Sequence, residues 1–560
     1  MTKGMTGLPA ANRLWLKWAS GACLLTNLLL LAWYIFQGYK HVIHGDSASR
    51  VLLAQEIVES GKLFPPDWFY VNGDILSLST HLAILPLLGA LPAGFLVHAI
   101  SSMIFASLVL HSAWLLTGTL ALEWERRVLV LAVLAGGISS VSVDFLFGQL
   151  TYGVILGSCF YLVFLAYRGA TETQKRRKRT LDGLLSLLCF AACSSNPKRA
   201  AIYYFAPLAA ALAFQAFHNA KLGMAPDLRR VCTTGWMASL GFLSGALFYL
   251  WLAPSLLITP GVDVVRLAPA LDIVRNMTAL WGQYIETVAG RVPTNDLLTS
   301  STGLAFAGRL GIAVTLVWLV CQACGVHFQK PLSGAAFLSV FATSLTLLLV
   351  AIQVTTSLPG SGRFLLPGLV CLLVLTLATP LDFWAAPIRT LAVLFTFASF
   401  IGASWSVLYT DVRTAENLKE RRERQALQNF LEDNGLSYGY APMNDAAPLS
   451  VMSDGKVLVR SIIVVDGLPI PAPWISSLRW YKPGAWSRPT FMMLTPDQSD
   501  AVDWTALQGF GVAPTRRLTF GKFIIWVFED NIASHGLPGW PNPMPFIEKR
   551  QGRLASPSQG

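Results

Sequence analysis

The sequence predicts an α-helical polytopic membrane protein with about eleven transmembrane helices and a C-terminal soluble α/β domain. The first observation is composition: 54% of the 560 residues are hydrophobic, 13% are charged, and the mean hydropathy is +0.52. The second is the recurrence of apolar runs long enough to cross a bilayer. The third is a change after Tyr409, since the last 151 residues hold 16 basic and 15 acidic residues, as a water-soluble domain does. This composition excludes a cytosolic enzyme and a disordered chain.

The first apolar run covers residues 18–36 and follows Lys3, Arg13 and Lys17. Because the run is long enough for the bilayer core and lacks a small-residue cleavage site, we expect an uncleaved span with its N-terminus in the cytoplasm. The further predicted crossings are 94–117, 128–143, 150–167, 181–194, 200–217, 232–253, 303–325, 333–354, 363–380 and 388–409.

Basic residues between the apolar runs set the predicted orientation. The densest group is Lys175–Arg179, and an odd number of crossings places it in the cytoplasm and the tail outside. Most of the net charge of +11 belongs to the membrane part, so we interpret it as a topology signal rather than a nucleic-acid-binding surface. A contact with anionic lipid is the alternative for Lys175–Arg179.

The chain divides into three predicted parts. Runs of β-branched residues at 462–465 and 523–528, together with turn dipeptides, predict strands after the last span. The final stretch is rich in Pro, Gly and Ser. The predicted domains are a transmembrane bundle over 1–410 with outer-face loops 37–93 and 254–302, an outer α/β domain over 411–535, and an irregular C-terminal tail over 536–560.

The first outer loop places a carboxylate at the start of a predicted helix. The segment Gly45-Asp46-Ser47-Ala48 precedes a stretch in which apolar residues recur at helical spacing and Gln55, Glu56 and Glu59 take the other face. This pattern predicts a helix that lies along the membrane surface. Asp46 could cap the N-terminus of that helix, or act as a base at the bilayer edge.

The order of these features resembles the GT-C class of integral-membrane glycosyltransferases, including the bacterial mannosyl- and aminoarabinose-transferase superfamily. The residues of the resemblance are Gly45-Asp46-Ser47-Ala48 after the first span and Gly362-Arg363-Phe364-Leu365-Leu366-Pro367 at a late one. The resemblance implies transfer of a sugar from a polyprenyl-phosphate-linked donor to a lipid, glycan or protein acceptor at the periplasmic face of a bacterial inner membrane. It also implies that Asp46 is the catalytic base. Many relatives have a second acid in this loop, whereas Ser47 follows Asp46 here.

Glycosyl transfer explains the residue types. The reaction passes through an oxocarbenium-like state, so one carboxylate takes the proton of the acceptor while the lipid phosphate leaves. Positive charge stabilises that phosphate through charge-assisted hydrogen bonds. The candidates are Lys198, Arg199 and Arg363, which lie on the predicted outer side. The alternative is that each side chain only extends toward water at the end of a span.

Two further carboxylates are candidates. Asp144 lies in a very short outer turn among apolar residues, where it could pair with Arg199 or Arg363 or serve as a second active-site carboxylate. Asp74 follows Asn72-Gly73 and could be a turn residue or contact the acceptor.

His44 and His81 share the first loop with these acids, and we interpret them as interfacial or sugar-contacting side chains. A divalent metal site is the less favoured alternative, because no spacing resembles a zinc pattern. Tyr70, Trp281 and Tyr284 could form an aromatic belt or stack on sugars. We therefore predict no cofactor beyond the lipid-linked donor.

Other functions remain open at this point. A secondary transporter is less favoured, because there is no convincing internal repeat and few ionisable residues lie deep in the apolar runs. An O-antigen polymerase or ligase would share the donor and the outer face but depend on outer-loop arginines. In the tail, the aromatic segments Tyr438–Ala441 and Trp474–Trp480 could be domain core or bind the acceptor. Motifs of nucleotide-driven pumps and serine hydrolases do not occur.

Overall fold

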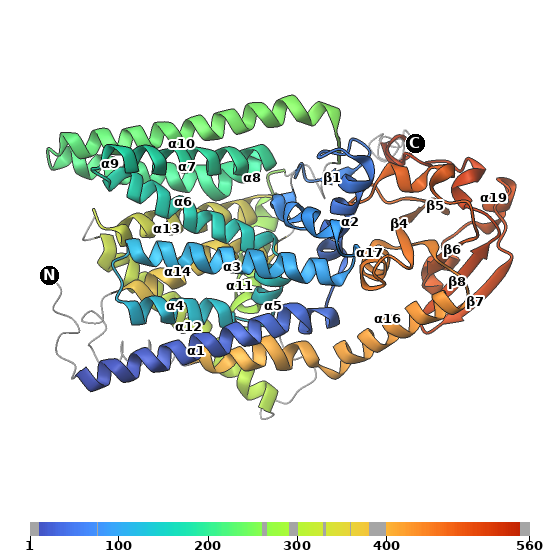
Figure 1. Ribbon diagram of the computed structural model, residues 1–560, viewed down its shortest axis with the longest axis horizontal. Helices are drawn as coiled ribbons and strands as arrows, with labels where there is room; N and C mark the ends of the chain where they lie inside the picture. The colour runs from blue at the N-terminus through green and yellow to red at the C-terminus, as the bar shows by residue number, and fades with distance from the viewer. Residues whose placement is uncertain are drawn as a thin grey trace. The chain divides into compact units, whose positions relative to one another are not determined.

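In a computed structural model, the chain forms two compact units (Figure 1). The first consists of Met1–Gly38, Ser102–Trp251 and Asp263–Val412, and the second of Tyr39–Ser101, Leu252–Val262 and Arg413–Gly560. The described residues are 10–75, 77–259, 266–290, 301–328, 332–358, 360–379 and 399–548.

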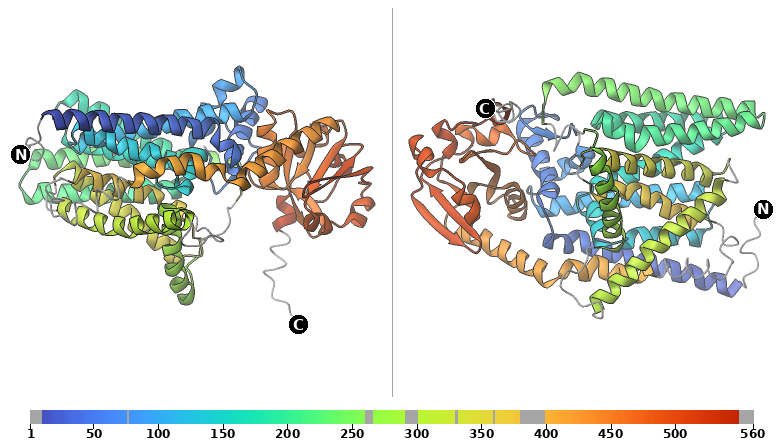
Figure 2. Two further views of the ribbon diagram at one scale, coloured as in Figure 1. Left: turned by 90° about the horizontal axis from the view of Figure 1, so that it is seen from below. Right: turned by 180° about the vertical axis from the view of Figure 1, so that it is seen from behind.

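The first unit is a bundle of α-helices, and most of its long helices run lengthwise beside one another (Figures 1 and 2). Several of these helices are apolar over most of their length. A helix that contacts lipid on one side and other helices on the other side is expected to have this composition. The elements are α1 (Ala10–Phe36), α3 (Phe95–Thr119), α4 (Trp124–Gly136), α5 (Ser140–Val143), the π-helical turn η4 (Asp144–Gly148), α6 (Thr151–Thr171), α7 (Lys175–Ser195), α8 (Pro197–Ala200), the π-helical turn η5 (Ala201–Phe205), α9 (Ala206–Lys221), α10 (Ala225–Leu252), α11 (Ala270–Ala289), α12 (Ser301–Phe328), α13 (Gly334–Thr355) and α14 (Gly362–Ala378).

Seven helices in the described part of the chain are long and apolar enough to cross a membrane, or eight if one bent pair is a single span. Each of the seven coincides with a predicted crossing. This set indicates a polytopic helical membrane protein. The seven segments are Lys17–His41, Phe95–Thr119, Thr151–Thr171, Pro197–Lys221, Ala225–Ser255, Phe306–Phe328 and Gly334–Thr355.

The bent pair corresponds to the predicted crossing 128–143. The α4 helix ends at Gly136, and the segment Ser140–Gly148 leaves it at an angle of 91°. Gly137 lies at the break with a φ of +75°, a conformation that side chains disfavour. The apolar run is therefore not one straight helix. A local backbone conformation divides it, and hydropathy does not predict that conformation.

The three remaining predicted crossings differ from the seven in other ways. The run 181–194 lies in α7, whose first turns hold the basic residues Lys175–Arg179, and this helix is not among the apolar spans. The run 363–380 corresponds to α14, an apolar helix of 17 residues. The first half of the run 388–409, up to residue 398, lies outside the described residues.

Close helix packing in the first unit is visible where α1 lies along α4. The buried Asn27 side chain donates from Nδ2 to the carbonyl oxygen of Ala132 at 2.8 Å. Gly136 permits this approach, because a Cβ at that position would overlap Asn27 and Ser404. A small residue and an interhelical hydrogen bond are the usual means of joining helices in a bilayer.

The second unit contains a six-stranded sheet with the strand order β5-β4-β3-β6-β8-β7. Strand β3 pairs in parallel with β4 and β6, and the other neighbours are antiparallel. The predicted β-branched runs form β4 and β8. The strands are β3 (Tyr438–Ala441), β4 (Leu458–Val465), β5 (Leu468–Pro471), β6 (Thr490–Leu494), β7 (Arg516–Phe520) and β8 (Phe523–Phe528).

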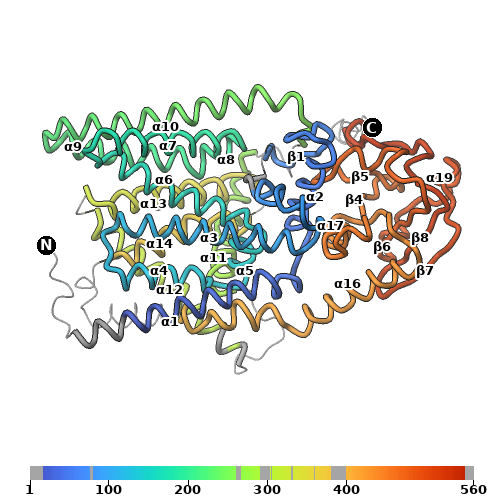
Figure 3. Tube along the Cα trace, in the orientation of Figure 1, coloured from blue at the N-terminus to red at the C-terminus, as the bar shows by residue number. Residues whose placement is uncertain are grey.

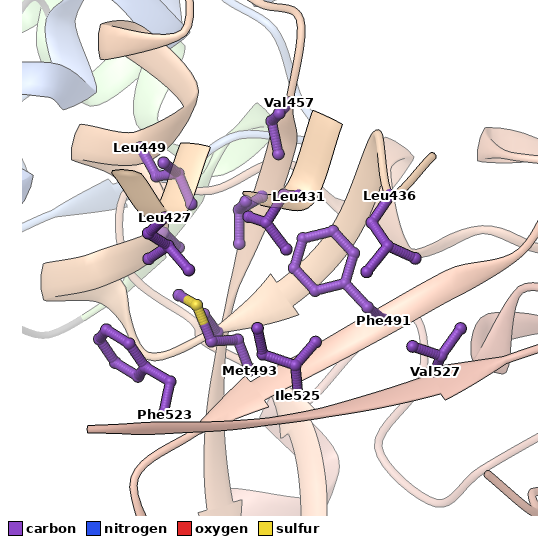
Figure 4. Packing of buried hydrophobic residues seen from close by; sticks show 13 residues of the cluster. Leu427, Leu431, Leu436, Leu449, Val457, Phe491, Met493, Phe523, Ile525 and Val527 are labelled. Atoms are coloured by element: carbon purple, nitrogen blue, oxygen red, sulfur yellow. The ribbon is translucent and has the colours of Figure 1, made fainter. Parts of the chain in front are cut away.

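One face of this sheet holds the hydrophobic core of the unit. Alternate residues of β6 and β8 point to it, and two helices, α16 (Ala415–Asp433) and α17 (Met443–Met452), cover it. Figure 3 follows the chain from α16 through α17 into the strands, and Figure 4 shows the packed side chains. The labelled core residues are Leu427, Leu431, Leu436, Leu449, Val457, Phe491, Met493, Phe523, Ile525 and Val527.

Segments from the first outer loop belong to the same unit as the sheet. Trp68 bridges to Ser477, and the backbone N–H of Phe69 donates to Ser476 O at 2.8 Å. The short strands β1 and β2 pair in parallel, with Tyr70 opposite Ile258. The elements here are α2 (Gly45–Ser60), β1 (Phe69–Val71), the 3-10 helices η2 (Ser77–Ala83) and η3 (Leu85–Gly89), and β2 (Leu257–Thr259).

Candidate functional site

Asp46 lies in the first turn of α2, and its side chain is exposed. The helix begins at Gly45, with His44 at the N-cap and no side-chain capping hydrogen bond from it. A carboxylate in the first turn is favoured by the partial positive charge of the helix N-terminus. Asp46 is therefore the second residue of the predicted helix rather than its cap, and its carboxylate is open to solvent.

Basic side chains of α16 reach the chain just before Asp46. Arg424 Nη1 donates to the carbonyl oxygen of Ile43 at 3.3 Å, and Arg421 Nη1 lies 3.3 Å from His41 Nε2. Both arginines line a small pocket with Lys40. Three positively charged side chains therefore lie close to the N-terminal end of α2. Sequence reasoning missed this group, because α16 had the pattern of an ordinary charged helix more than 370 residues away.

The inner side of α2 begins a buried polar network. The hydroxyls of Ser47 and Tyr39 are 2.5 Å apart, and the Tyr39 ring stacks on His98 with a centroid distance of 5.4 Å. Arg50 Nη2 in turn lies 3.3 Å from His98 Nδ1. These contacts fix the rotation of α2 about its axis, so that Ser47 and Arg50 face inward while Asp46 faces outward.

His81 and Tyr70 are buried within the second unit. Burial and the charge of Arg50 lower the pKa of His81 to about 4, so the imidazole is neutral at pH 7. Burial and the nearby Glu56 carboxylate raise the pKa of Tyr70. Both side chains are about 1% exposed, which places them in the packing of the unit rather than at a membrane surface.

Asp74 lies at the end of a tight turn in the first loop. Asn72 and Gly73 both have positive φ, at 59° and 74°, and the N–H of Asp74 donates to Val71 O at 3.1 Å. This geometry is that of an Asn-Gly turn after β1. The Asp74 side chain is half-buried.

Glu56 differs from its predicted place on the exposed polar face of α2. Its side chain is fully buried, with Arg479 Nη1 donating to Oε1 at 3.0 Å and Trp480 Nε1 donating to Oε2 at 3.1 Å. Burial raises the pKa of Glu56, and the charge of Arg479 opposes that rise. The side of α2 that holds Glu56 is thus covered within the unit, and this carboxylate has protein partners rather than water.

The sheet face opposite the core is aromatic and holds one buried arginine. Tyr440 on β3 is paired in register with Arg460 on β4. The guanidinium carbon of Arg460 lies 4.0 Å from the Trp480 ring centre and 5.6 Å from that of Tyr438. Within the described residues, Nε and Nη1 of Arg460 have no hydrogen-bond partner although the residue is only 4% exposed. The tyrosine hydroxyls, by contrast, are bonded: Tyr438 donates to Trp480 O at 2.7 Å.

In the first unit, the turn with Asp144 and the start of α14 share an aromatic neighbour. Gln149 Nε2 donates to Asp144 Oδ2 at 3.1 Å. The Tyr152 ring lies 5.8 Å from that of Phe145 and 6.2 Å from that of Phe364, each next in sequence to a candidate residue. The structure thus brings the Asp144 turn and the Arg363 helix start together.

The basic candidates of the first unit lie at two helix starts. In α8, the Asn196 side chain caps the helix by accepting from Arg199 N at 3.0 Å, with Lys198 exposed and Arg199 half-buried. Arg363 follows the first residue of α14, and its guanidinium carbon lies 5.3 Å from the Phe364 ring centre. Its Nε is buried and has no hydrogen-bond partner among the residues that the structure describes.

Trp281 and Tyr284 are neighbours on α11 with different surroundings. Trp281 is 60% exposed, whereas Tyr284 is 7% exposed and its hydroxyl donates to Ala313 O at 2.7 Å. The Tyr284 contact joins α11 to α12 and is structural. Trp281 alone of the pair offers a ring face to a ligand or to lipid.

The predicted site residues thus fall into two groups. Those of the second unit are Asp46, Asp74, His44, His81 and Tyr70, and those of the first are Asp144, Lys198, Arg199, Arg363, Trp281 and Tyr284. No group of three His, Cys, Asp or Glu side chains in the described ranges could hold a metal ion. No family model, curated protein or solved structure matches the chain.

Proposed function

We propose that the protein is a glycosyltransferase that moves a sugar from a polyprenyl-phosphate-linked donor to an envelope acceptor at the periplasmic face of a bacterial inner membrane. The N-terminus would then be cytoplasmic and the sheet-containing unit periplasmic. The single observation that supports this proposal most is the position of Asp46. Its exposed carboxylate stands in the first turn of the helix that follows the first span, in the same unit as the basic pocket of Lys40, Arg421 and Arg424.

In the proposed reaction, the acceptor hydroxyl gives its proton to the Asp46 carboxylate as its oxygen bonds to the anomeric carbon of the sugar. The bond from that carbon to the phosphate oxygen breaks, and the phosphate leaves with the electron pair. Because Asp46 is exposed, an acceptor hydroxyl can approach it directly. A lipid phosphate needs charge neutralisation rather than a general acid, so cationic side chains suffice on the leaving side.

Arg363, Arg199 and Lys198 are the proposed contacts of the donor phosphate. The buried Nε of Arg363 is a hydrogen-bond donor with no acceptor in the described part of the chain, which favours an oxyanion as its partner. Asp144, whose turn shares the aromatic neighbour Tyr152 with the start of α14, is proposed as a second carboxylate that orients a sugar hydroxyl or a cationic side chain. Asp74, His44 and Trp281, whose side chains are at least partly exposed, are the proposed contacts of the sugar or the acceptor, whereas the burial of His81 and Tyr70 favours a packing role for these two.

The proposal is tested by mass spectrometry of membrane glycolipids and envelope glycans from cells with and without the protein. A sugar of defined mass that disappears without the protein identifies the donor and acceptor classes together. Cells with Asp46→Asn should lose the same sugar, because the amide cannot take the proton. The matched control is Glu59→Gln, which removes a carboxylate from the other end of the same helix.

Two outcomes would contradict the proposal. Wild-type glycan levels in cells with Asp46→Asn, at equal amounts of folded protein, would remove Asp46 as the base. Accumulation of an unmodified solute in sealed vesicles, without any covalent product, would instead indicate a secondary transporter.

A further inference from the structure

A pocket of about 520 Å³ lies at the N-terminal ends of α7 and α10 in the first unit. Its walls come from one residue in the first turn of α7 and from the first turns of α10. The lining residues are Lys178, Ala225, Pro226, Arg229, Arg230 and Thr233. Three of these six carry positive charge, and none carries negative charge.

The lysine of this pocket is held in place by hydrogen bonds. Lys178 Nζ donates to Asp182 Oδ2 at 2.8 Å and to Thr234 Oγ1 at 2.9 Å, and it also reaches the backbone oxygens of Gly169 and Arg230 at 3.1 and 3.3 Å. Asp182 is 5% exposed, so its charge lies behind the pocket wall. The ammonium is therefore ordered before any ligand arrives.

The surroundings of the pocket are strongly positive. Residues 175–182 and 225–233 together hold seven basic and two acidic side chains, and both acids are engaged: Asp182 with Lys178, and Asp227 with Arg230. The N-terminal ends of two helices add partial positive charge at the same place. This combination attracts an anionic group such as a phosphate.

The outward face of α10 continues from the pocket as an apolar track. Trp236, Leu240, Leu243 and Leu247 are spaced by three or four residues and therefore share one side of the helix. Their exposed fractions are 70%, 46%, 59% and 58%. In a membrane-spanning helix, such a face meets acyl chains. The pocket of about 520 Å³ is cationic and has room for more than a phosphate ion, and it lies at the start of this apolar face, so a phospholipid fits it better than a free anion.

We propose that this pocket binds the phosphate-bearing headgroup of an anionic phospholipid, with Arg229 and Arg230 as its contacts and the acyl chains along α10. This site does not depend on the proposed transfer reaction. It lies at the N-terminal end of α7, whereas Arg199 follows the C-terminal end of the same helix, and lipid binding needs no sugar donor. Basic pockets between membrane helices are known to bind anionic headgroups through the same charge complementarity.

The test is native mass spectrometry of the full chain in detergent, titrated with phosphatidylglycerol and with phosphatidylcholine of the same acyl chains. The wild-type protein should bind phosphatidylglycerol in preference. The double variant Arg229→Gln with Arg230→Gln should weaken that binding roughly thirtyfold, since two surface charges are lost. The matched control is Arg516→Gln with Arg517→Gln, an adjacent and exposed arginine pair on β7.

Further arms separate the possible results. Arg229→Gln alone leaves the pair of Arg230 with Asp227 intact, so it reports on binding even if the double variant unfolds. Inorganic phosphate should not protect the protein against heating at concentrations where the lipid does. Equal binding by wild type and Arg229→Gln, equal binding of the two lipids, or protection by phosphate alone would each overturn the proposal.

Discussion

Glu56 Oε1 accepts a hydrogen bond of 3.0 Å from Arg479 Nη1, a residue 423 positions later in the chain. The other oxygen of the same carboxylate accepts from the indole N–H of Trp480 at 3.1 Å. Both oxygens of a fully buried carboxylate thus have partners, and a helix from the first loop is joined to the sheet-containing segment of its own unit.

Replacing Glu56 by leucine should destabilise the second unit by about 3 kcal/mol, because a buried acceptor pair is lost and Arg479 keeps its charge. The half-exposed Arg479 can rehydrate in part, which limits the loss. Thermal unfolding in detergent, followed by the summed emission of the 18 tryptophans, measures the change. Glu59→Leu is the matched control on the same helix. Equal melting temperatures for the two variants would contradict this account of the pair.

The free energy of unfolding should decrease as the pH is lowered, because His81 is buried in its neutral form. A histidine of the unfolded chain titrates near 6.5, whereas the pKa of His81 in the folded protein is about 4. The folded state binds this proton less tightly, so the stabilisation present above about pH 6.5 is lost as pH falls toward 4, by about 3 kcal/mol in all. We expect His81→Gln to flatten the decline in melting temperature between about pH 7 and pH 5. The control variant His535→Gln removes an imidazole paired with Asp530 and should show the same decline in melting temperature as the wild type. Parallel curves of melting temperature against pH for the wild type and His81→Gln would contradict the prediction.

Arg460→Met should leave the free energy of unfolding unchanged or raise it. Burying a guanidinium with unbonded nitrogens costs several kcal/mol, and ring contacts with Trp480 and Tyr438 return about 2 kcal/mol. Methionine fills much of the same volume without that cost. Denaturation of both proteins in the same detergent gives the comparison. The control is Arg517→Met, which removes an exposed arginine 5.4 Å from the Trp526 ring; a large loss of stability specific to Arg460→Met would refute the prediction.

Gly153→Ala should disturb the turn that holds Asp144. A Cβ at Gly153 would overlap the carbonyl oxygen of Leu146 in η4, a backbone group that cannot move without shifting the turn. The expected cost is about 1–3 kcal/mol. Gly311→Ala in α12 is the matched control, because nothing lies within 4 Å of its added carbon and alanine favours the helix. Melting temperatures of the two variants, measured side by side, decide the matter: an unaffected Gly153→Ala protein would mean the turn adapts freely.

The spans could be predicted because bilayer crossing is a local property of a run of residues. Helices α10 and α13 follow from hydropathy alone, as do the strands β4 and β8 from their β-branched runs. The bend after Gly136 could not be predicted in this way, because it depends on the backbone of three residues in an otherwise apolar run.

The helix start at Asp46 was also predictable, since a short polar segment before an amphipathic run is a local signal. The burial of Glu56 could not be predicted. A polar helix face has the same sequence pattern whether it is in contact with water or with a side chain such as Arg479. The arginines of α16 beside His41 and Ile43 share this property: only the fold brings the two segments together. Pairs of charged residues that lie far apart in the chain are the part of the candidate site that the periodicity of the sequence cannot predict.

The bond between Glu56 and Arg479 also sets an order of events during synthesis. At the usual speed of a ribosome, the 423 residues between them take roughly 20 to 80 seconds to be made. Throughout that interval α2 exists without the sheet, and its carboxylate must stay hydrated. The second unit therefore reaches its final packing only after translation of most of the chain, because α2 of the first loop packs against a segment made much later.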